Sequence, residues 1–418
     1  MNHELLSVAE AKEYLLSQFT AVEPVHVDLV RAAGMVLAQP ITAPFDVPSF
    51  ANSSMDGYAV ISGDSQSASP ANPVVLKVVG DIPAGTFPTI SLSSGCCLRI
   101  MTGAPLPKGA NAVVPLEAVE DLSGIPGNPT QGFIRITAPV MEGDFVRGVG
   151  IDFPKNEIIL PKGVRLRPQD IGLLAMVGIP QVPVFRPPKI ALFSTGSELT
   201  PLGEPLQPGR IFDANNYSLG ALVTKYGAEL YHLGIAKDSF EDVKFCLDRA
   251  VSLKVDLIVS SAAVSVGVFD YVREVMERDG ELSFWRVNMR PGKPLAFGKY
   301  HQIPLVGLPG NPVSAFVGFE VFVRLAILKM SGEENIERTR HRVLLEEPVS
   351  SDGRESYLRA KVWLQDGRYH ASLASHQGSG NLYSLVQSNA FLIVPSEVKS
   401  LPIGAEVDAW LFEPVYSR

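Results

Sequence analysis

The clearest pattern along the chain is a short, strongly apolar run that passes directly into a loop of small residues. It occurs three times, in Lys189–Glu198, Asp256–Gly267 and Ile303–Ser314. An apolar run of this length before Ser, Gly and Ala is typical of a buried parallel strand. Because helical patterns separate the runs, the sequence predicts a doubly wound α/β sheet. In such a sheet the carboxyl ends of the strands share one edge, where ligands bind.

Small residues at that edge let backbone N–H groups approach an anion closely. The three loops are therefore predicted to bind a phosphorylated or otherwise anionic ligand. Their candidate binding residues are Ser194, Thr195 and Gly196 in the first loop, Ser261, Ser265 and Gly267 in the second, and Pro309, Asn311 and Pro312 in the third.

Capping residues and helical periodicity predict the helices. Ser7-Val-Ala-Glu10 forms a capping box that opens a helix ending at about Phe19. Asn311 and Pro312 place a preferred N-cap residue before a preferred first-turn residue. Further helices are predicted near 214–226, 239–253, 271–279 and 312–330.

Two segments have a β pattern instead. Residues 51–142 are rich in Val, Ile, Pro and Gly and show little helical periodicity. Residues 335–418 return to this pattern, with a predicted hairpin over Tyr357–Leu373 around Asp366-Gly367. The other expected elements are a strand and turn over 25–36, a proline-rich linker over 37–50, a loop over 142–150 and a short helix over 167–178 that ends at Gly178.

Composition narrows the class of protein. At 418 residues, and about 150 residues per domain, the chain is long enough for roughly three domains. The net charge of −8 argues against non-specific nucleic-acid binding, which needs a basic surface. The three cysteines form no disulfide framework, so a reducing, cytoplasmic location is expected. The most apolar helix carries Glu320 and Arg324, which argues against a membrane span.

Arg290 and Lys293 flank a Pro-Gly turn that includes Gly292. Cations on a stiff turn suit an oxyanion, because Arg offers a planar fork and Lys a point charge. Taken alone, such a turn is more often a solvated surface loop. Its position in the same α/β unit as the three loops favours the anion-binding interpretation.

Asp213, Asp270 and Glu198 are acids on loops of this unit. Carboxylates beside phosphate-binding loops commonly hold Mg²⁺, so Asp213 and Asp270 are candidate metal ligands. Each also precedes a predicted helix, and an N-cap is the more frequent role of such an aspartate. Glu198 can act as a base or cap a turn. The sequence contains no Cys/His cluster with metal-ligand spacing, no Walker loop and no nucleophile elbow.

Taken together, eight stretches resemble the MoeA-type molybdopterin molybdenumtransferase family, to which the E domain of gephyrin belongs. The matching stretches are SSMDGYAV at 53–60, GDIPAG at 80–85, RIMTGAPLPKGANAVVPLE at 99–117, FSTGSEL at 193–199, GRIFDANN at 209–216, SVGVFDYV at 265–272, RPGKPLAFG at 290–298 and GLPGNPVSAF at 307–316. One such stretch is a weak signal, whereas eight in the same order along nearly the whole chain are specific.

The resemblance implies a multidomain α/β plus β fold with four parts. These are a stem and dimerisation domain at 1–45 and 143–178, an inserted β domain at 46–142, a three-layer α/β molybdopterin-binding domain at 179–331, and a small β-barrel at 332–418. It also implies a homodimer. Its cleft would lie between the α/β domain and barrel of one subunit and the inserted domain of the other.

The implied reaction inserts molybdate into adenylylated molybdopterin, with release of AMP and help from Mg²⁺. A molybdopterin adenylyltransferase would act upstream. By position, the residues that match molybdate-contacting groups are Arg290, Lys293, Arg359 and Ser379. The matches to the remaining functional positions are Asp270 for Mg²⁺ or phosphate, Asp213 and Glu198 for acids of the cleft, and Asp56 and Thr102 for a pair from the partner subunit.

Two departures from the family pattern leave alternatives open. Ala262 and Ala263 stand where the family usually has two glycines, and each added methyl takes space near the pterin or phosphate. If either residue needs a positive φ, the cost is roughly 1 kcal/mol or more. Arg290 stands where lysine is common. Ala262 and Ala263 support one alternative, a catalytically weakened molybdopterin-binding scaffold. A tungstate-inserting relative is the other, because tungstate and molybdate have nearly the same size and charge.

Overall fold

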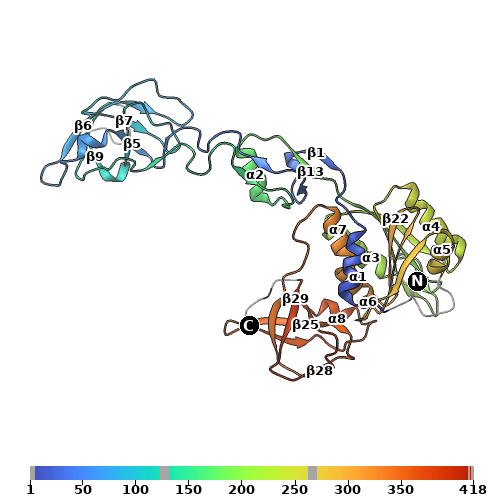
Figure 1. Ribbon diagram of the computed structural model, residues 1–418. Helices are drawn as coiled ribbons and strands as arrows, with labels where there is room; N and C mark the ends of the chain where they lie inside the picture. The colour runs from blue at the N-terminus through green and yellow to red at the C-terminus, as the bar shows by residue number, and fades with distance from the viewer. Residues whose placement is uncertain (1–4, 123–130, 262–270, 413–414, 416–418) are drawn as a thin grey trace. The chain divides into compact units, whose positions relative to one another are not determined.

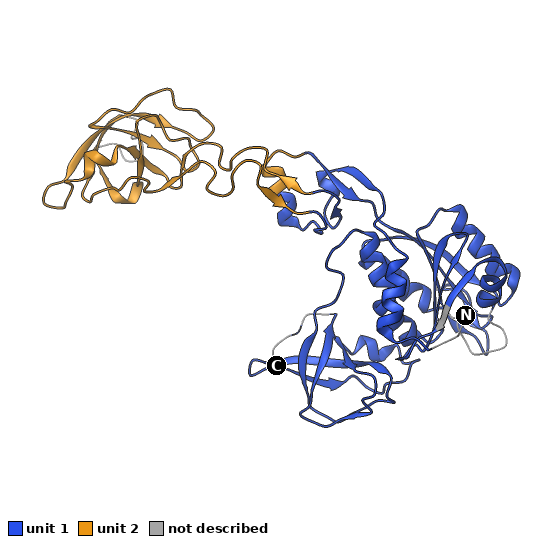
Figure 2. Cartoon of the chain, viewed as in Figure 1, with its two compact units in different colours: residues 1–39, 162–172, 180–418 blue, residues 40–161, 173–179 orange. Residues whose placement is uncertain are grey.

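The computed structural model describes residues 5–122, 131–261, 271–412 and 415. The chain forms two compact units (Figure 2). Unit 1 comprises residues 1–39, 162–172 and 180–418, and unit 2 comprises residues 40–161 and 173–179. None of the helices in the described ranges combines the length and apolar character that a membrane span requires.

The centre of unit 1 is a six-stranded sheet (Figure 1). Its strands, in spatial order, are β17 (Glu229–Ala236), β14 (Lys189–Thr195), β18 (Leu257–Ser261), β22 (Ile303–Leu308), β21 (Pro294–Tyr300) and β19 (Glu281–Arg286). The first four strands are parallel, and β21 and β19 extend the sheet in antiparallel fashion. The three predicted strands are thus confirmed as β14, β18 and β22.

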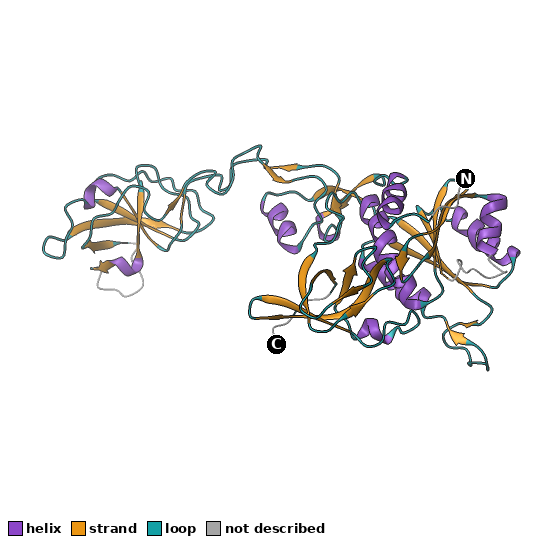
Figure 3. Ribbon diagram, turned by 60° about the horizontal axis from the view of Figure 1, so that its bottom comes forward, coloured by secondary structure: helices purple, strands orange, loops and turns teal. Residues whose placement is uncertain are grey.

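Helices cover both faces of this sheet (Figures 1 and 3). One face carries α1 (Val8–Ser17), α3 (Asn215–Lys225), α6 (Pro312–Gly318) and α7 (Arg324–Met330), and the other carries α4 (Phe240–Ser252) and α5 (Tyr271–Asp279). Successive strand residues point to opposite faces, so Leu192 and Val259 belong to one hydrophobic cluster, and Ala191 and Ile258 to the other. This is the predicted three-layer α/β arrangement.

The predicted helices are present, with one interruption. The capping box is confirmed, because Ser7 N donates to Glu10 Oε2 at 2.8 Å. Asn311 occupies the N-cap of α6 as predicted, but its side chain makes no capping hydrogen bond. The helix expected over 312–330 is divided by a π-helical turn, η4 (Phe319–Val323), which joins α6 to α7.

The carboxyl-terminal strands close into a small barrel. Around the ring lie β25 (Glu355–Gln365), β26 (Arg368–Leu373), β23 (His341–Leu345), β29 (Glu406–Leu411) and β27 (Ala390–Val394), which pairs again with β25. The predicted hairpin is confirmed as β25–β26. Its turn residues Asp366 and Gly367 have φ of 49° and 75°, the positive values that a type I′ turn requires.

Unit 2 consists mainly of a second six-stranded sheet, as its β pattern predicted. The strands, in spatial order, are β8 (Ala112–Pro115), β5 (Gly57–Val60), β7 (Cys96–Ile100), β6 (Val74–Ile82), β10 (Gly132–Ile136) and β9 (Val119–Asp121). Two short ladders adjoin it in the chain: β11 (Val146–Arg147) pairs with β4 (Asn52–Ser53), and β12 (Ile158–Leu160) with β3 (Ile41–Thr42). The loop expected over 142–150 and the linker expected over 37–50 therefore each contain a short strand. Their partners lie far along the chain, where no local pattern reveals them.

The segments on either side of unit 2 in the chain also form regular secondary structure. β1 (Pro24–Asp28), β13 (Gln181–Phe185) and β2 (Val36–Leu37) form a three-stranded sheet, with a 3₁₀ turn at Leu29–Arg31 after β1. The strand and turn expected over 25–36 are thus present. The short helix is α2 (Pro168–Met176), and Gly178 follows it with a positive φ, as its predicted role as a helix stop requires.

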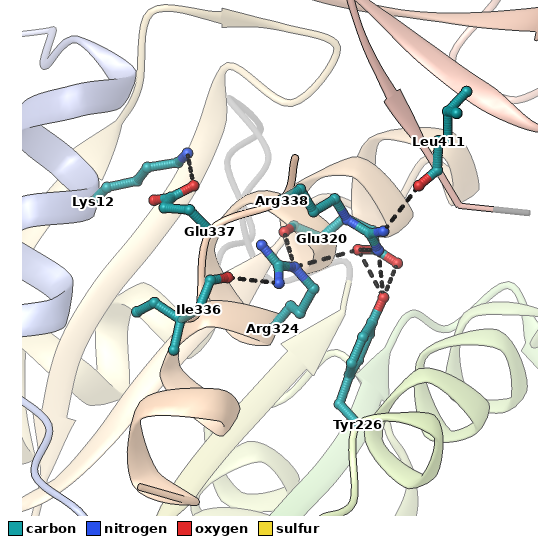
Figure 4. Close-up of polar contacts among 8 residues, drawn as sticks. All are labelled: Lys12, Tyr226, Glu320, Arg324, Ile336, Glu337, Arg338 and Leu411. Atoms are coloured by element: carbon teal, nitrogen blue, oxygen red, sulfur yellow. Dashed lines mark hydrogen bonds and ion pairs between the residues drawn. The ribbon is translucent and has the colours of Figure 1, made fainter. Parts of the chain in front are cut away.

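A buried charge cluster joins the α/β domain to the barrel within unit 1 (Figure 4). Glu320 is 2% exposed and accepts hydrogen bonds from Tyr226 Oη at 2.8 Å and Arg338 Nη2 at 2.6 Å. Arg338 also donates to Leu411 O of β29 at 3.3 Å. Burial and the charge of Glu320 raise the pKa of Tyr226, so its hydroxyl stays protonated and donates. The cluster therefore fixes the barrel against α3 and η4.

Candidate functional site

The carboxyl ends of β14 and β18 form the switch point of the central sheet. From β14 the chain runs through α3 to β17 on one side, and from β17 through α4 to β18 on the other. Connections that leave in opposite directions open a crevice, and ligands bind there. A cavity of about 940 Å³ lies at this point. The predicted residues that line it are Thr195, Gly196, Glu198, Asp213, Ser261, Lys293, Pro309, Asn311 and Pro312.

Asp213 lines this cavity as a buried carboxylate that already accepts three hydrogen bonds. Its Oδ1 accepts from Ser194 Oγ at 3.0 Å and from Asn216 N at 3.1 Å, and its Oδ2 accepts from Asn216 Nδ2 at 2.6 Å. These contacts tie the end of β14 to the first turn of α3. The geometry gives Asp213 a capping role for α3, and it places Ser194 behind the cavity wall, where it supports Asp213.

Asn215 holds two of the predicted loops together. Its Nδ2 donates to Ser261 Oγ at 2.6 Å and to Gly310 O at 2.8 Å. The loop after β18 and the loop after β22 are therefore both anchored to the first turn of α3. Sequence reasoning did not single out Asn215, because it lies inside a predicted helix.

The loop after β14 brings acids to the cavity. A Cβ on Gly196 would lie 2.7 Å from Glu198 Oε2, so only glycine lets this carboxylate fold back over the loop. The next residue, Ser197, donates its N–H to Asp238 Oδ2 at 2.7 Å. Glu198 and Asp238 both line the cavity, and so do the cations Arg286 and Lys293. The larger cavity therefore holds charges of both signs.

A second cavity, of about 420 Å³, adjoins the first. The two share Lys293, Pro294, Pro309 and Asn311. The second cavity is also lined by the predicted residues Arg290, Gly292, Arg359 and Ser379, and by Arg354. Its described lining includes these cations and no carboxylate. A cavity of this charge suits an oxyanion.

Arg359 is the most deeply buried of these cations. It lies on β25, is 1% exposed, and donates to Ser384 Oγ and Gly378 O, each at 3.0 Å. Burial and the nearby charge of Arg290 lower the pKa of Arg359 to about 10, which keeps it positively charged at neutral pH. Because these hydrogen bonds go to neutral oxygens, its charge remains available to an anion.

The turn that carries Arg290 and Lys293 is held from both sides. β20 (Met289–Arg290) pairs in parallel with the start of β25 in the barrel. Arg354 strengthens this pairing, because its Nη1 donates to Met289 O at 3.1 Å. On the other side, Val287 N donates to Lys293 O at 2.9 Å and closes the turn. The two cations therefore stand where the α/β domain meets the barrel.

Asp56 and Thr102 form an exposed pair in unit 2. Thr102 N and Thr102 Oγ1 each donate to Asp56 Oδ1 at 2.7 Å. These hydrogen bonds lower the pKa of Asp56, so the carboxylate is charged at neutral pH. Asp56 precedes β5 and Thr102 follows β7. The two residues lie side by side because these strands pair in antiparallel fashion. The structure thus brings together two residues that the resemblance paired.

Three predicted residues, Ser265, Gly267 and Asp270, lie outside the described residues, as do Ala262 and Ala263. Sequence reasoning missed Asp238, Arg286 and Arg354. Asp238 could have been found, because it lies two residues after the end of β17, whose carboxyl end reaches the same edge of the sheet. Arg286 and Arg354 have no comparable signal, since neither is beside a loop of small residues that follows a parallel strand.

The described residues do not by themselves fit Mg²⁺. Both oxygens of Asp213 already accept hydrogen bonds from the protein, and the second predicted ligand, Asp270, lies outside the described ranges. Among the residues that the structure describes, no three or more His, Cys, Asp or Glu side chains are grouped as a metal site.

The fold and the site define a multidomain α/β protein with a polar cavity at the switch point of its sheet and a small β-barrel beside it. Comparison with known families narrows this class. The chain matches the MoeA N-terminal region (domain I and II) over residues 6–178, the probable molybdopterin binding domain over 191–329, and the MoeA C-terminal region (domain IV) over 342–412. The chain belongs to the molybdopterin molybdenumtransferase family, as its motifs indicated.

Individual relatives agree along nearly the whole length. The molybdopterin molybdenumtransferase of Nostoc sp. is 38% identical over 91% of this chain and 87% of its own length. That of Haemophilus influenzae is 33% identical over 96% of this chain and 98% of its own length. The crystal structure of the molybdopterin biosynthesis MoeA protein from Pyrococcus horikoshii superposes with a TM-score of 0.82 at 31% identity, covering 98% of this chain and all of that one.

Proposed function

We propose that this chain is a molybdopterin molybdenumtransferase that inserts molybdate into adenylylated molybdopterin, releases AMP and forms the molybdenum cofactor. The observation that carries the proposal is the pair of adjoining cavities that share Lys293. The larger cavity has the volume and the strand-end backbone groups that a nucleotide-linked pterin needs. The smaller cavity, with its four cations, suits molybdate.

Both substrates are anions, so they repel each other as they come together in the site. Arg290, Lys293 and Arg359 offset this repulsion, because cations already fixed in place attract anions without reorganisation. Lys293 borders both cavities and can contact either substrate. The dithiolene sulfurs of the substrate bind the metal, so the protein's task is to bind and orient the two anions.

Proton transfer is assigned to Glu198. Asp213 is engaged by Ser194 and Asn216, and Asp238 accepts a hydrogen bond from Ser197 N. Glu198 lines the same cavity, and its carboxylate borders the loop at Gly196. It is therefore the acid of this cavity best placed to exchange a proton with substrate oxygen.

The proposal includes a homodimer in which the partner subunit supplies an Asp56–Thr102 pair to the cleft. Unit 2 exposes several large apolar side chains, among them Met141, Ile151 and Ile158. Where exposed apolar side chains form a contiguous patch, another protein commonly covers them. Sedimentation velocity should give twice the mass of one 45.1 kDa chain, and a monomer at micromolar concentration would contradict this part.

Other parts of the proposal are supported by the family resemblance and, for the location, by the lack of a disulfide framework. These are Mg²⁺, a cytoplasmic location, an upstream molybdopterin adenylyltransferase, and the division at 1–45 with 143–178, 46–142, 179–331 and 332–418. Because the described residues do not fit Mg²⁺, no step is derived through it.

The test supplies purified protein with adenylylated molybdopterin, Mg²⁺ and micromolar molybdate, and follows AMP release together with active cofactor. Both products should appear, and both should require molybdate. Product formation with tungstate alone would favour the tungstate-inserting alternative. Tight nucleotide binding without products from either ion would favour the scaffold alternative, for which Ala262 and Ala263 are the main sequence support.

A further inference from the structure

An exposed apolar surface lines the larger cavity beside its charged residues. It consists of Leu199, Ile211 and Phe212, which we call the apolar ledge. Ile211 is 57% exposed and Phe212 is 42% exposed, although both lie against a cavity. The anion-binding loops and the cations do not account for these side chains, because apolar groups contribute nothing to binding of phosphate or molybdate.

Backbone hydrogen bonds fix the main chain of the ledge. β15 (Leu199–Thr200) and β16 (Ile211–Phe212) form a two-stranded parallel ladder outside the main sheet. Ile211 N donates to Glu198 O at 2.9 Å, and Asp213 N donates to Thr200 O at 3.2 Å. Phe212 is therefore the last residue of the ladder and directly precedes Asp213, which caps α3. Its position is fixed by the same contacts that build the site.

An exposed aromatic ring inside a ligand cavity is a platform for a planar ring of the ligand. Burying apolar surface is favourable, and a stacked heterocycle adds a contact between ring faces that depends little on its substituents. The cavity of about 940 Å³ has room for such a ring together with the phosphate it carries. The cations Arg286 and Lys293 line the same cavity and can hold the phosphate.

We infer that Phe212, which lines this cavity, binds a planar nitrogen heterocycle of the substrate by stacking. This inference rests on the proposed function, whose substrate contains two such heterocycles, a purine and a pterin. Their shared chemistry is a flat pyrimidine ring with polar edges that is fused to a second ring. Phe212 is a binding residue for that ring and takes no part in proton or metal transfer.

The experiment uses the full chain and three variants, Phe212→Ala, Phe212→Tyr and Phe245→Ala. Tyrosine keeps the ring of Phe212. Phe245 is the matched control, because it is 66% exposed on α4 and is not among the residues that line the cavity. Isothermal titration with AMP and with pterin-6-carboxylate measures binding of the purine and of the pterin separately. Molybdate-dependent AMP release is measured in parallel.

We expect Phe212→Ala to weaken binding of one probe or both by about ten-fold or more, the loss typical of removing a stacked ring. Phe212→Tyr should restore wild-type affinity, and Phe245→Ala should not change it. The probe whose binding is weakened shows whether the purine or the pterin stacks on Phe212. Wild-type affinity of Phe212→Ala for both probes, with normal AMP release by the wild-type chain, overturns the inference and leaves the proposed function intact.

Two further outcomes also decide the question. If Phe212→Ala keeps wild-type affinity for both probes but weakens self-association, the ledge is covered by a second copy of the chain and the inference is wrong. If the wild-type chain releases no AMP with molybdate and binds neither probe, the proposed function fails and the inference fails with it.

Discussion

At the residue scale, Asp213 stabilises the site through three hydrogen bonds to Ser194 and Asn216. Asp213→Asn would replace the acceptor Oδ2 with an amide NH₂ group that faces the donor Nδ2 of Asn216. We expect the free energy of unfolding to fall by about 1–3 kcal/mol, the cost of leaving a buried polar group unsatisfied. Urea unfolding measures this, with Glu204→Gln on an exposed loop as the control. Unchanged stability of Asp213→Asn would rule out the capping role.

Arg359 is the residue on which the small cavity depends most. Molybdate that binds beside its buried charge should stabilise the folded protein, because a ligand of the native state raises the unfolding temperature. Arg359→Met should abolish this molybdate-dependent rise. Arg368→Met, an exposed arginine on the neighbouring β26, should keep it. A molybdate response that survives in Arg359→Met would show that the anion binds elsewhere.

These residues differ in how far the sequence reveals them. Arg290 and Lys293 stand out because a Pro-Gly turn separates them. Arg359 lies in the middle of a strand, where nothing local marks it, and only the resemblance indicates it. Its burial depends on closure of the barrel, and its proximity to Arg290 depends on the pairing of β20 with β25. Both are long-range contacts that a local pattern does not contain.

At the scale of elements, the site depends on the docking of β20 against β25. Arg354 reinforces this docking through Met289 O and is itself oriented by Asp352, whose Oδ2 accepts from Arg354 Nε at 3.0 Å. Arg354→Gln should therefore raise the KM for molybdate by about ten-fold, equivalent to about 1.4 kcal/mol. The KM for adenylylated molybdopterin should stay within about two-fold, because Arg354 does not line the larger cavity.

Steady-state kinetics with each substrate varied in turn separates these two effects. Arg342→Gln is the control, since Arg342 forms an exposed ion pair with Asp408 on the barrel. Equal rises in both KM values for Arg354→Gln would mean that the substitution disturbs the whole site rather than the docking of β20.

Elements with a polar face were predicted well, whereas the buried helical segment was predicted in its span but not in its π-helical turn. α4 has clear amphipathic periodicity, and its predicted span 239–253 matches Phe240–Ser252. The segment α6–η4–α7 is buried on nearly every side. An extra residue in one helical turn shifts the positions of the polar face along the sequence. A helix without a polar face gives no such sign. The π-helical turn that aims Glu320 at Arg338 therefore follows from packing alone.

At the scale of the whole molecule, Glu320 holds the barrel in place against the α/β domain. Glu320→Gln leaves Arg338 and Arg324 without their buried counter-charge, and the free energy of unfolding should fall by about 3–5 kcal/mol. Asp408→Asn is the control, because Asp408 also bridges two arginines but lies at the surface. It should cost about 1 kcal/mol or less. Urea unfolding measures the free energy of unfolding of both variants. An equal loss in Glu320→Gln and Asp408→Asn would contradict the claim that burial makes Glu320 the more important of the two.

The sequence indicates a multidomain α/β plus β protein, and the two sheets and the barrel confirm this class. The pairing of β11 with β4 and of β12 with β3 could not be predicted, because each strand is only two or three residues long. The buried cluster around Glu320 was equally hidden. Its members come from α3, η4 and the segment before β23, and only the folded chain brings them together.

The central claim is that two anions meet at Lys293, where the two cavities join. The most direct measurement is AMP release from adenylylated molybdopterin, with and without molybdate, by the wild-type chain, Lys293→Ala and the exposed barrel variant Lys361→Ala. Molybdate-dependent release by the wild type and Lys361→Ala, with a loss of about a hundred-fold or more in Lys293→Ala, is the predicted result. Full molybdate-dependent release by Lys293→Ala would contradict the claim.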